Sequence, residues 1–142
     1  MSARSRKRAS VFLDTHGLLA VLNADDAHHD AAAALFNSLA DDRTPVFTSD
    51  WVLAEFLSVA ARRTLRAPAA AIADDLRSSP LTTVLPATRT GWDQAFRLFR
   101  SRKDKEWSFV DCTSIMLCNQ FRITGVVTND HHFAQAGLRV LL

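Results

Sequence analysis

The chain has 142 residues, of which 48% are hydrophobic and 23% charged, and its formal net charge is +2. This composition excludes a disordered or fibrous protein, and the longest apolar run, residues 31–36, is too short to span a membrane. We therefore expect one globular domain with no membrane segment. Cys112 and Cys118 lie six positions apart on a predicted helix and point to different faces, which indicates free thiols in a reducing cytoplasm.

Basic residues are concentrated in the first eight positions, ahead of an apolar stretch at residues 11–13, as in a signal peptide. Asp14 ends that stretch, so we expect no export signal. Residues 1–10 are predicted to form a basic, flexible tail, and residues 11–142 a single domain. The tail has two open interpretations, since it is either a contact for nucleic-acid phosphates or simply a disordered end.

Short runs rich in β-branched and aromatic residues alternate with segments of helical periodicity. In chain order we predict a strand at residues 10–14, a helix through 18–22, a helix at 26–39 and a strand at 45–48. A helix from 49 or 50 to 65 follows, then a helix from 68 that ends before 80 and a strand at 82–85. The last predicted elements are a helix at 90–102, a helix from 108 to 121, and strands at 125–128 and 138–142. This alternation predicts an α/β fold with a central parallel sheet.

Four carboxylates stand close to the ends of predicted strands. Asp14 and Asp130 leave the first and fourth strands, and Glu55 lies one turn into the helix that follows the second. Asp111 lies in the first turn of the helix that enters the fourth strand. Because chemistry in an open parallel sheet collects beyond the carboxyl ends of its strands, we expect all four side chains to converge there.

Each carboxylate also has a purely structural interpretation. Asp14 and Asp130 are suitable caps for helices or turns. Ser108 and Asp111 have the S-x-x-D spacing of a capping box. Glu55 has apolar neighbours, but it also fits the solvent-facing side of its helix.

Three or four convergent carboxylates would form a site for Mg²⁺ or Mn²⁺, which prefer oxygen ligands. Such ions activate water and neutralise charge on phosphate, so the predicted chemistry is phosphoester cleavage. The tandem pairs His28-His29 and His131-His132 are predicted to be polar surface residues and not zinc ligands, because adjacent side chains diverge.

Five blocks of the sequence resemble the PIN-domain family, and most closely its VapC-type toxin ribonucleases. They are residues 11–15, 25–29, 49–56, 107–112 and 128–133, the last followed by Ala136-Gly137. The ordered series Asp, Glu, Asp, Asp within these blocks makes the resemblance specific. Two features depart from the usual pattern: His16 stands where a small polar residue is common, and the basic tail places the first acid later than usual.

The resemblance implies a three-layer α/β/α sandwich and a Mg²⁺- or Mn²⁺-dependent endoribonuclease, the toxin of a type II toxin-antitoxin system. It implies a homodimer, an RNA substrate and a cognate antitoxin that blocks the acidic site. By position, the principal metal ligands would be Asp14 and Asp111, the residues that bind a second metal or position water would be Glu55 and Asp130, and the supporting hydroxyls would be Thr15 and Thr128.

Two other classes of protein compete with this interpretation. One is a non-catalytic PIN module that binds RNA or protein and keeps its acids for structure; the complete set of acids argues against it. The other is a phosphoacceptor receiver domain, which needs paired early acids and a lysine after its last strand. Neither feature occurs here.

Overall fold

The structure is a computed structural model that describes residues 9–142 of the chain. Within these residues, five strands form one sheet in the order β3-β2-β1-β4-β5, and all paired neighbours are parallel. The strands are β1 (Val11–Leu13), β2 (Val46–Ser49), β3 (Thr82–Leu85), β4 (Gly125–Val127) and β5 (Arg139–Val140). The predicted α/β class and parallel sheet are confirmed. Residues 1–8 of the tail predicted for residues 1–10 lie outside the described residues.

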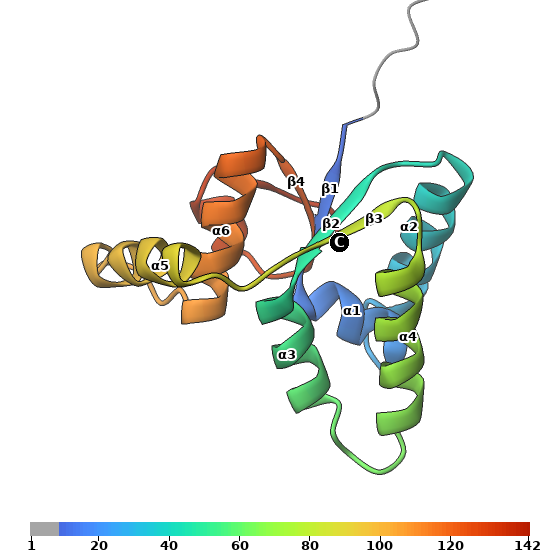
Figure 1. Cartoon of the computed structure of the whole chain (residues 1–142). Coiled ribbons are helices and arrows are strands. Elements are labelled where there is room, and N and C mark those ends of the chain that lie inside the picture. The colour runs from blue at the N-terminus through green and yellow to red at the C-terminus, as the bar shows by residue number, and fades with distance from the viewer. Residues whose placement is uncertain (1–8) are drawn as a thin grey trace, which may run out of the picture.

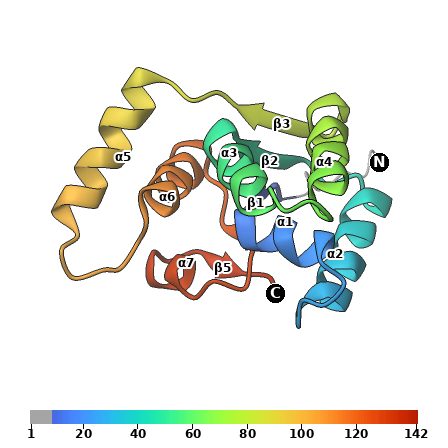
Figure 2. The same cartoon turned by 90° about the horizontal axis from the view of Figure 1, so that it is seen from below.

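Helices cover both faces of the sheet. They are α1 (Thr15–Leu22), α2 (His29–Asp41), α3 (Asp50–Val59), α4 (Arg66–Ser78), α5 (Arg89–Ser101), α6 (Phe109–Phe121) and α7 (His132–Gln135). In Figures 1 and 2, α2 and α4 lie on one side of the strands, α6 lies on the other, and α5 extends away from the body. This arrangement confirms the three-layer α/β/α sandwich.

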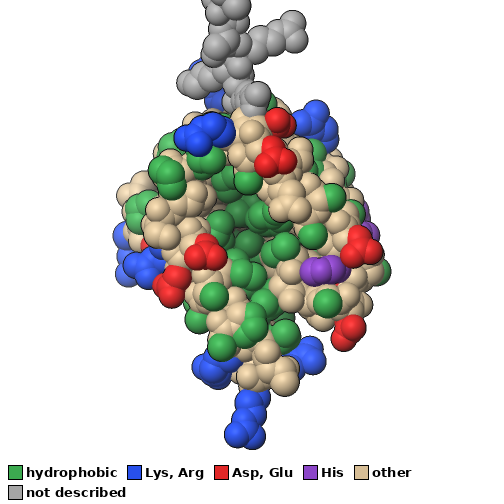
Figure 3. All heavy atoms as spheres, turned by 90° about the vertical axis from the view of Figure 1, so that its right-hand side faces the viewer, with side chains coloured by type: hydrophobic (Ala, Val, Ile, Leu, Met, Phe, Trp, Pro, Cys, Tyr) green, Lys and Arg blue, Asp and Glu red, His purple; other side chains and the backbone are tan. Residues whose placement is uncertain are grey.

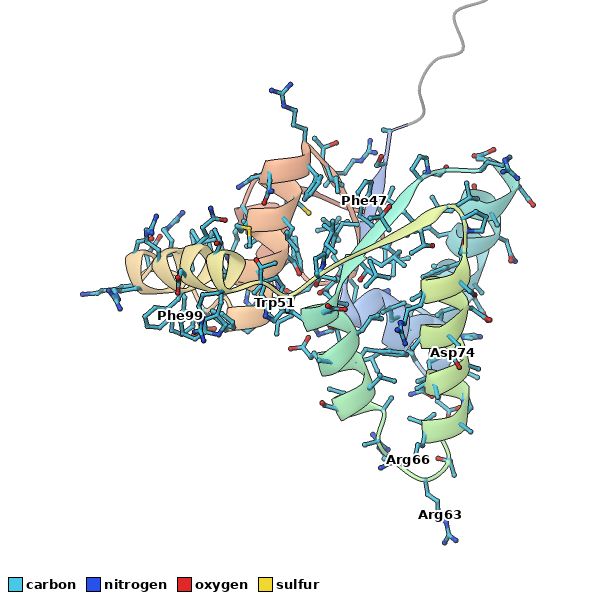
Figure 4. All side chains as sticks on the ribbon, viewed as in Figure 1. Phe47, Trp51, Arg63, Arg66, Asp74 and Phe99 are labelled. Atoms are coloured by element: carbon cyan, nitrogen blue, oxygen red, sulfur yellow. The ribbon has the colours of Figure 1, made fainter. Side chains whose placement is uncertain are left out.

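The predicted long helix after the second strand ends earlier than expected. Helix α3 stops at Val59, and a turn closed by bonds from the backbone N–H groups of Leu65 and Arg66 to the Arg62 carbonyl leads into α4. The reason is tertiary, because the chain must reverse for α4 to pack beside α3. Figure 4 shows Arg63 at the tip of this turn, pointing away from the body.

The start of α2 and the short helix α7 also differ from the sequence prediction. Helix α2 begins at His29 and not near residue 26, because the Asp26 carboxylate accepts the backbone N–H of His28 and holds a turn there. Helix α7 was not predicted at all, because four residues are too few to show a helical period.

The core of the sheet forces α1 close to β4. Phe12 and Leu13 are fully buried, and burial of each such side chain contributes about 1.5–3 kcal/mol. On α1, a Cβ atom at Gly17 would collide with the carbonyl oxygen of Val127. Only glycine therefore allows this approach, which holds the start of α1 against the end of β4.

The order of the strands reverses between β1 and β4. The chain runs from β1 outward to β2 and β3, then returns to the other side of β1 to form β4 and β5. The crevice beyond the carboxyl ends of β1 and β4 is therefore the topological switch point, where open α/β sheets place their ligands. Leu13 pairs with Val127, so Asp14 and Thr128 leave the sheet side by side.

Two other expectations concern features away from this edge. Both cysteines are free and buried on α6, as their spacing predicted. Among residues 9–142, no helix is both long enough and apolar enough to cross a membrane.

Candidate metal centre

Asp14 has a capping role and lies at the centre of the carboxyl edge. It is the N-cap of α1, where its Oδ2 accepts the backbone N–H of His16 at 3.4 Å. The same oxygen accepts the Thr128 hydroxyl at 2.8 Å, across 114 positions of sequence. Within the described residues, Oδ1 accepts no hydrogen bond, so it remains free to bind a ligand while Oδ2 anchors the side chain.

Asp111 is positioned by the predicted capping box. The Ser108 hydroxyl accepts the backbone N–H of Asp111 at 3.0 Å, and Asp111 Oδ2 accepts the backbone N–H of Ser108 at 3.1 Å. Burial raises the pKa of the Asp111 carboxyl, and the negative charges of Asp14 and Asp130 raise it further. The capping interpretation is thus confirmed, and the charges of Asp14 and Asp130 act on the same carboxyl.

Asp130 is held by the loop that follows β4. Its backbone N–H donates to the Thr128 hydroxyl oxygen at 3.1 Å, and its Oδ1 accepts the backbone N–H of His132 at 2.9 Å. Thr128 is fully buried. Its hydroxyl therefore links the Asp14 carboxylate to the backbone of Asp130, which is the supporting position that the resemblance implied.

Two histidines each contact two of the three carboxylates. His16 Nδ1 lies 3.2 Å from Asp14 Oδ2 and 3.8 Å from Asp130 Oδ2. His132 Nδ1 lies 3.2 Å from Asp130 Oδ1 and 3.5 Å from Asp111 Oδ2. The hydrogen bond to Asp14 raises the pKa of His16 to about 9, against the opposing effect of burial. Asp14, Asp111 and Asp130 therefore converge, as expected.

The prediction for the tandem histidines is correct for His131, whose side chain is 77% exposed, and wrong for His132, which is 22% exposed. Asp130 accepts the backbone N–H of His132, and this turn folds the imidazole back over the acids. A sequence signal exists, because an aspartate two positions ahead of a residue is typical of such a turn. His29 contacts the Ala20 carbonyl instead, at 2.9 Å.

Glu55 occupies a different position from the other three acids. It lies in the second turn of α3, half-buried, and in residues 9–142 no hydrogen bond or ion pair reaches it. Helix α3 packs against α1 and α6, which carry Asp14 and Asp111. Its membership of the site stays a prediction.

The donor set fits a hard divalent cation. The negative charges of Asp14 and Asp130 oppose ionisation of Asp111 and raise its pKa, so the acids repel one another. The Thr15 and Ser114 hydroxyl oxygens are buried and have no hydrogen-bond partner in the described part of the chain. Ser114 lies three positions after Asp111 and so on the same face of α6. A hydrated Mg²⁺ or Mn²⁺ would relieve the repulsion and supply partners for these hydroxyls.

Comparison with curated proteins identifies relatives that cover almost the whole chain. The 23S rRNA-specific endonuclease VapC20 from two strains of Mycobacterium tuberculosis is 33% identical over 128 residues, which are 89% of this chain and 94% of the relative. The crystal structure of M. tuberculosis VapC20, described as a sarcin-ricin loop cleaving toxin, has a TM-score of 0.77 and 31% identity, and covers 90% of this chain and 95% of its own.

More distant structures share the fold alone. FitAcB from Neisseria gonorrhoeae has a TM-score of 0.64 at 21% identity, over 93% of this chain and 96% of its own. VapBC2 from Rickettsia felis, bound to a DNA fragment from its promoter, has a TM-score of 0.67 at 16% identity, over 92% and 96%. The PIN domain family model matches residues 11–138. The chain therefore belongs to the PIN domain family.

Proposed function

We propose that this protein is a metal-dependent endoribonuclease and the toxin of a type II toxin-antitoxin system. The observation that carries the proposal is the convergence of Asp14, Asp111 and Asp130 at the switch point of the sheet. It is supported by the similarity to a 23S rRNA-specific endonuclease over 89% of the chain.

In the proposed mechanism, Asp14 and Asp111 hold Mg²⁺ or Mn²⁺, and Glu55 and Asp130 bind a second ion or orient the attacking water. When bound, the metal lowers the pKa of water and neutralises charge on the phosphate. The Thr128 hydroxyl and the Ser108 capping box keep the first two carboxylates in place. Their free oxygens then need no rearrangement when RNA arrives.

The proposed substrate is RNA, and ribosomal RNA is the first class to test because the relatives with more than 30% identity are named for it. The test is incubation of purified protein with 23S rRNA, total tRNA and mRNA, in Mg²⁺, Mn²⁺ or a chelator, followed by sequencing of new RNA ends. We expect cleavage at few positions, abolished by the chelator. No metal-dependent ends in any RNA class would contradict the proposal.

The same assay separates the remaining rival class, because a non-catalytic PIN module would bind RNA without producing new ends. The other rival, a receiver domain, is excluded because the PIN domain family model matches residues 11–138.

The antitoxin partner is proposed to cover an apolar groove between α2 and α4. The groove has a volume of about 390 Å³. In Figure 3, hydrophobic side chains line a hollow at the centre of this face, and both acidic and basic side chains lie around it. The lining residues include Val21, Phe36, Leu39, Ile72, Asp75 and Leu76. A partner segment with apolar side chains would fit it, and co-purification with the product of any small neighbouring reading frame tests this.

The homodimer is proposed to use the exposed apolar side chains of α3 and α5. Leu57 and Val59 on α3, and Trp92 and Phe99 on α5, are all exposed. Figure 4 shows Trp51 at the start of α3 and Phe99 farther along α5. Exposed large apolar residues mark protein interfaces where they form one contiguous patch. Light scattering of the purified chain tests the oligomeric state, and a monomer would contradict the assignment.

A further inference from the structure

A side-chain hydrogen bond joins the segment before α6 to the end of α7. The indole N–H of Trp107 donates to the side-chain carbonyl oxygen of Gln135 at 3.1 Å, across 28 positions of sequence. Trp107 is buried, and a buried indole N–H normally has a hydrogen-bond partner. Helices α6 and α7 lie beside each other (Figure 2), so the bond fixes one end of α7 to the start of α6.

Each end of this bond lies next to a turn that holds an acid. Trp107 directly precedes Ser108, whose backbone N–H donates to the Asp111 carboxylate at 3.1 Å. Gln135 is the last residue of α7, and the first backbone N–H of that helix donates to the Asp130 carboxylate at 2.9 Å. The Trp107–Gln135 bond therefore connects the segment that orients Asp111 to the segment that orients Asp130.

The indole ring of Trp107 is also held from a second direction. The Arg102 guanidinium lies over the ring, 5.0 Å from its centroid, in a cation–π contact. Arg102 in turn donates two hydrogen bonds to the Asp104 carboxylate, both at 3.0 Å. These contacts restrain Trp107 independently of Gln135, so the indole N–H is a fixed point to which α7 is attached.

Another long-range side-chain bond has the corresponding place beside Asp14. The Thr128 hydroxyl donates to Asp14 at 2.8 Å and accepts the backbone N–H of Asp130 at 3.1 Å, so it joins Asp14 to the loop after β4. The bond from Trp107 joins the Asp111 turn to the helix that follows the same loop. Together the two bonds connect the segments that carry all three acids.

We propose that Trp107 and Gln135 are positioning residues of the metal centre, whose hydrogen bond sets the place of the Asp130 turn relative to the Asp111 turn. They act through these two acids and bind neither metal nor RNA themselves. This inference rests on the proposed function, in which the two acids serve one centre. It adds a pair of residues outside the set of acids and hydroxyls.

The first test uses the full chain without metal or RNA. Gln135→Met keeps the length of an exposed side chain and removes its acceptor oxygen. The backbone N–H of His132, which donates to Asp130, should exchange with deuterium about 2–10-fold faster, the factor expected for loss of one hydrogen bond. The Ser108 N–H should change less, because Arg102 still holds the indole ring.

The matched control for this exchange measurement is Gln120→Met. It makes the same chemical change at an exposed position near the end of α6, and it should leave the exchange of the His132 N–H as in the wild-type chain. Exchange of this N–H at the wild-type rate in Gln135→Met would overturn the inference. So would equal acceleration in both variants.

The second test measures Mn²⁺ binding by calorimetry. Loss of a group that orients a metal ligand typically costs about 10–100-fold in affinity, so Gln135→Met should weaken Mn²⁺ binding about 10-fold. Gln135→Glu keeps an acceptor oxygen and should retain the wild-type affinity. In RNA cleavage, Gln135→Met should lower kcat and leave KM unchanged. A bond with a merely structural role would lower the stability of Gln135→Met without changing its Mn²⁺ affinity, which would overturn the inference.

A double-mutant cycle tests whether the two residues act through their common bond. Trp107→Phe removes the N–H and keeps an aromatic ring beside Arg102. Combined with Gln135→Met, it should weaken Mn²⁺ binding no further than the more damaging single change. Losses that multiply would overturn the inference, and if Trp107→Phe does not fold, the Gln135 variants decide alone. Failure of the proposed function is seen separately, as a wild-type chain that cleaves no RNA, because the exchange test needs neither metal nor RNA.

Discussion

The acidic edge of the sheet consists of individually positioned polar atoms, whereas the groove between α2 and α4 consists mainly of apolar surface. At the edge, individual oxygen and nitrogen atoms are fixed by hydrogen bonds such as that from Thr128 to Asp14. The groove is a hollow of about 390 Å³, lined mainly by apolar side chains without fixed polar partners. We infer that changing one atom at the edge abolishes cleavage, whereas only a change of polarity or volume in the groove abolishes partner binding.

The largest effect is expected for Asp111→Asn. Asparagine keeps an oxygen that can accept the Ser108 N–H, so folding should change by at most a few tenths of a kcal/mol. Cleavage should fall by orders of magnitude, because the metal loses a charged ligand. RNA-end sequencing and a denaturant titration measure the two quantities. Near wild-type turnover in a folded variant, free of contaminating ribonuclease, would refute the proposed centre.

Metal should also stabilise the fold, because it relieves the repulsion among the three acids of the edge. At about 100 times its dissociation constant, one bound ion adds about 2.7 kcal/mol to the free energy of unfolding. Melting with and without millimolar Mn²⁺ measures this difference, and Asp111→Asn should reduce it. Unchanged melting alongside metal-dependent cleavage would mean that the acids repel one another less than inferred.

Gly17→Ala tests whether the edge depends on the close approach of α1 to β4. The added methyl group meets the Val127 carbonyl oxygen, and such overpacking typically costs about 1–3 kcal/mol. Urea denaturation measures the loss. Gly125→Ala is the matched control, since its Cβ would meet only side-chain atoms, the nearest at 3.4 Å. Equal stability of the two variants would contradict the steric argument.

Leu76→Glu tests the groove. The half-buried Leu76 lines it, so a carboxylate there should oppose an apolar partner and weaken antitoxin binding by about 2 kcal/mol, the scale of an interface hot spot. Metal-dependent cleavage by the free chain should not change, because the acids lie at the carboxyl edge of the sheet and do not line the groove. A pull-down with the antitoxin and the RNA assay check both parts. Loss of cleavage with intact partner binding would show that Leu76 serves the acidic edge and not the groove.

The smallest effect concerns pH in the absence of metal. The pKa of His16 is raised from 6.5 to about 9, so its contribution to stability is fully present below pH 6.5 and disappears as the pH rises through about 9. Solvent screening reduces this contribution, since the side chain is half-exposed. We expect the melting temperature of the metal-free protein to fall over this range, and His16→Asn to flatten the slope. An unaltered slope of melting temperature against pH in the variant would mean that other titratable groups cause the pH dependence.

The sequence by itself determined the local features of this protein. Short runs of β-branched and aromatic residues predicted the strands, because they suit a buried parallel sheet. The spacing of Ser108 and Asp111 predicted a capping box that the structure confirms. The positions of Asp14 and Asp130 at strand ends predicted where the site lies. All of these signals act over a few residues, which is why the sequence alone reveals them.

Only the tertiary structure decided which side chains meet. The bond between Thr128 and Asp14 spans 114 positions, and the contact of His132 with Asp111 joins two different helices. The end of α3 likewise depends on α4 packing back against it. Such contacts follow from the reversal of strand order between β1 and β4, which brings distant segments to one edge. No local pattern encodes that juxtaposition, because it arises from packing the whole chain.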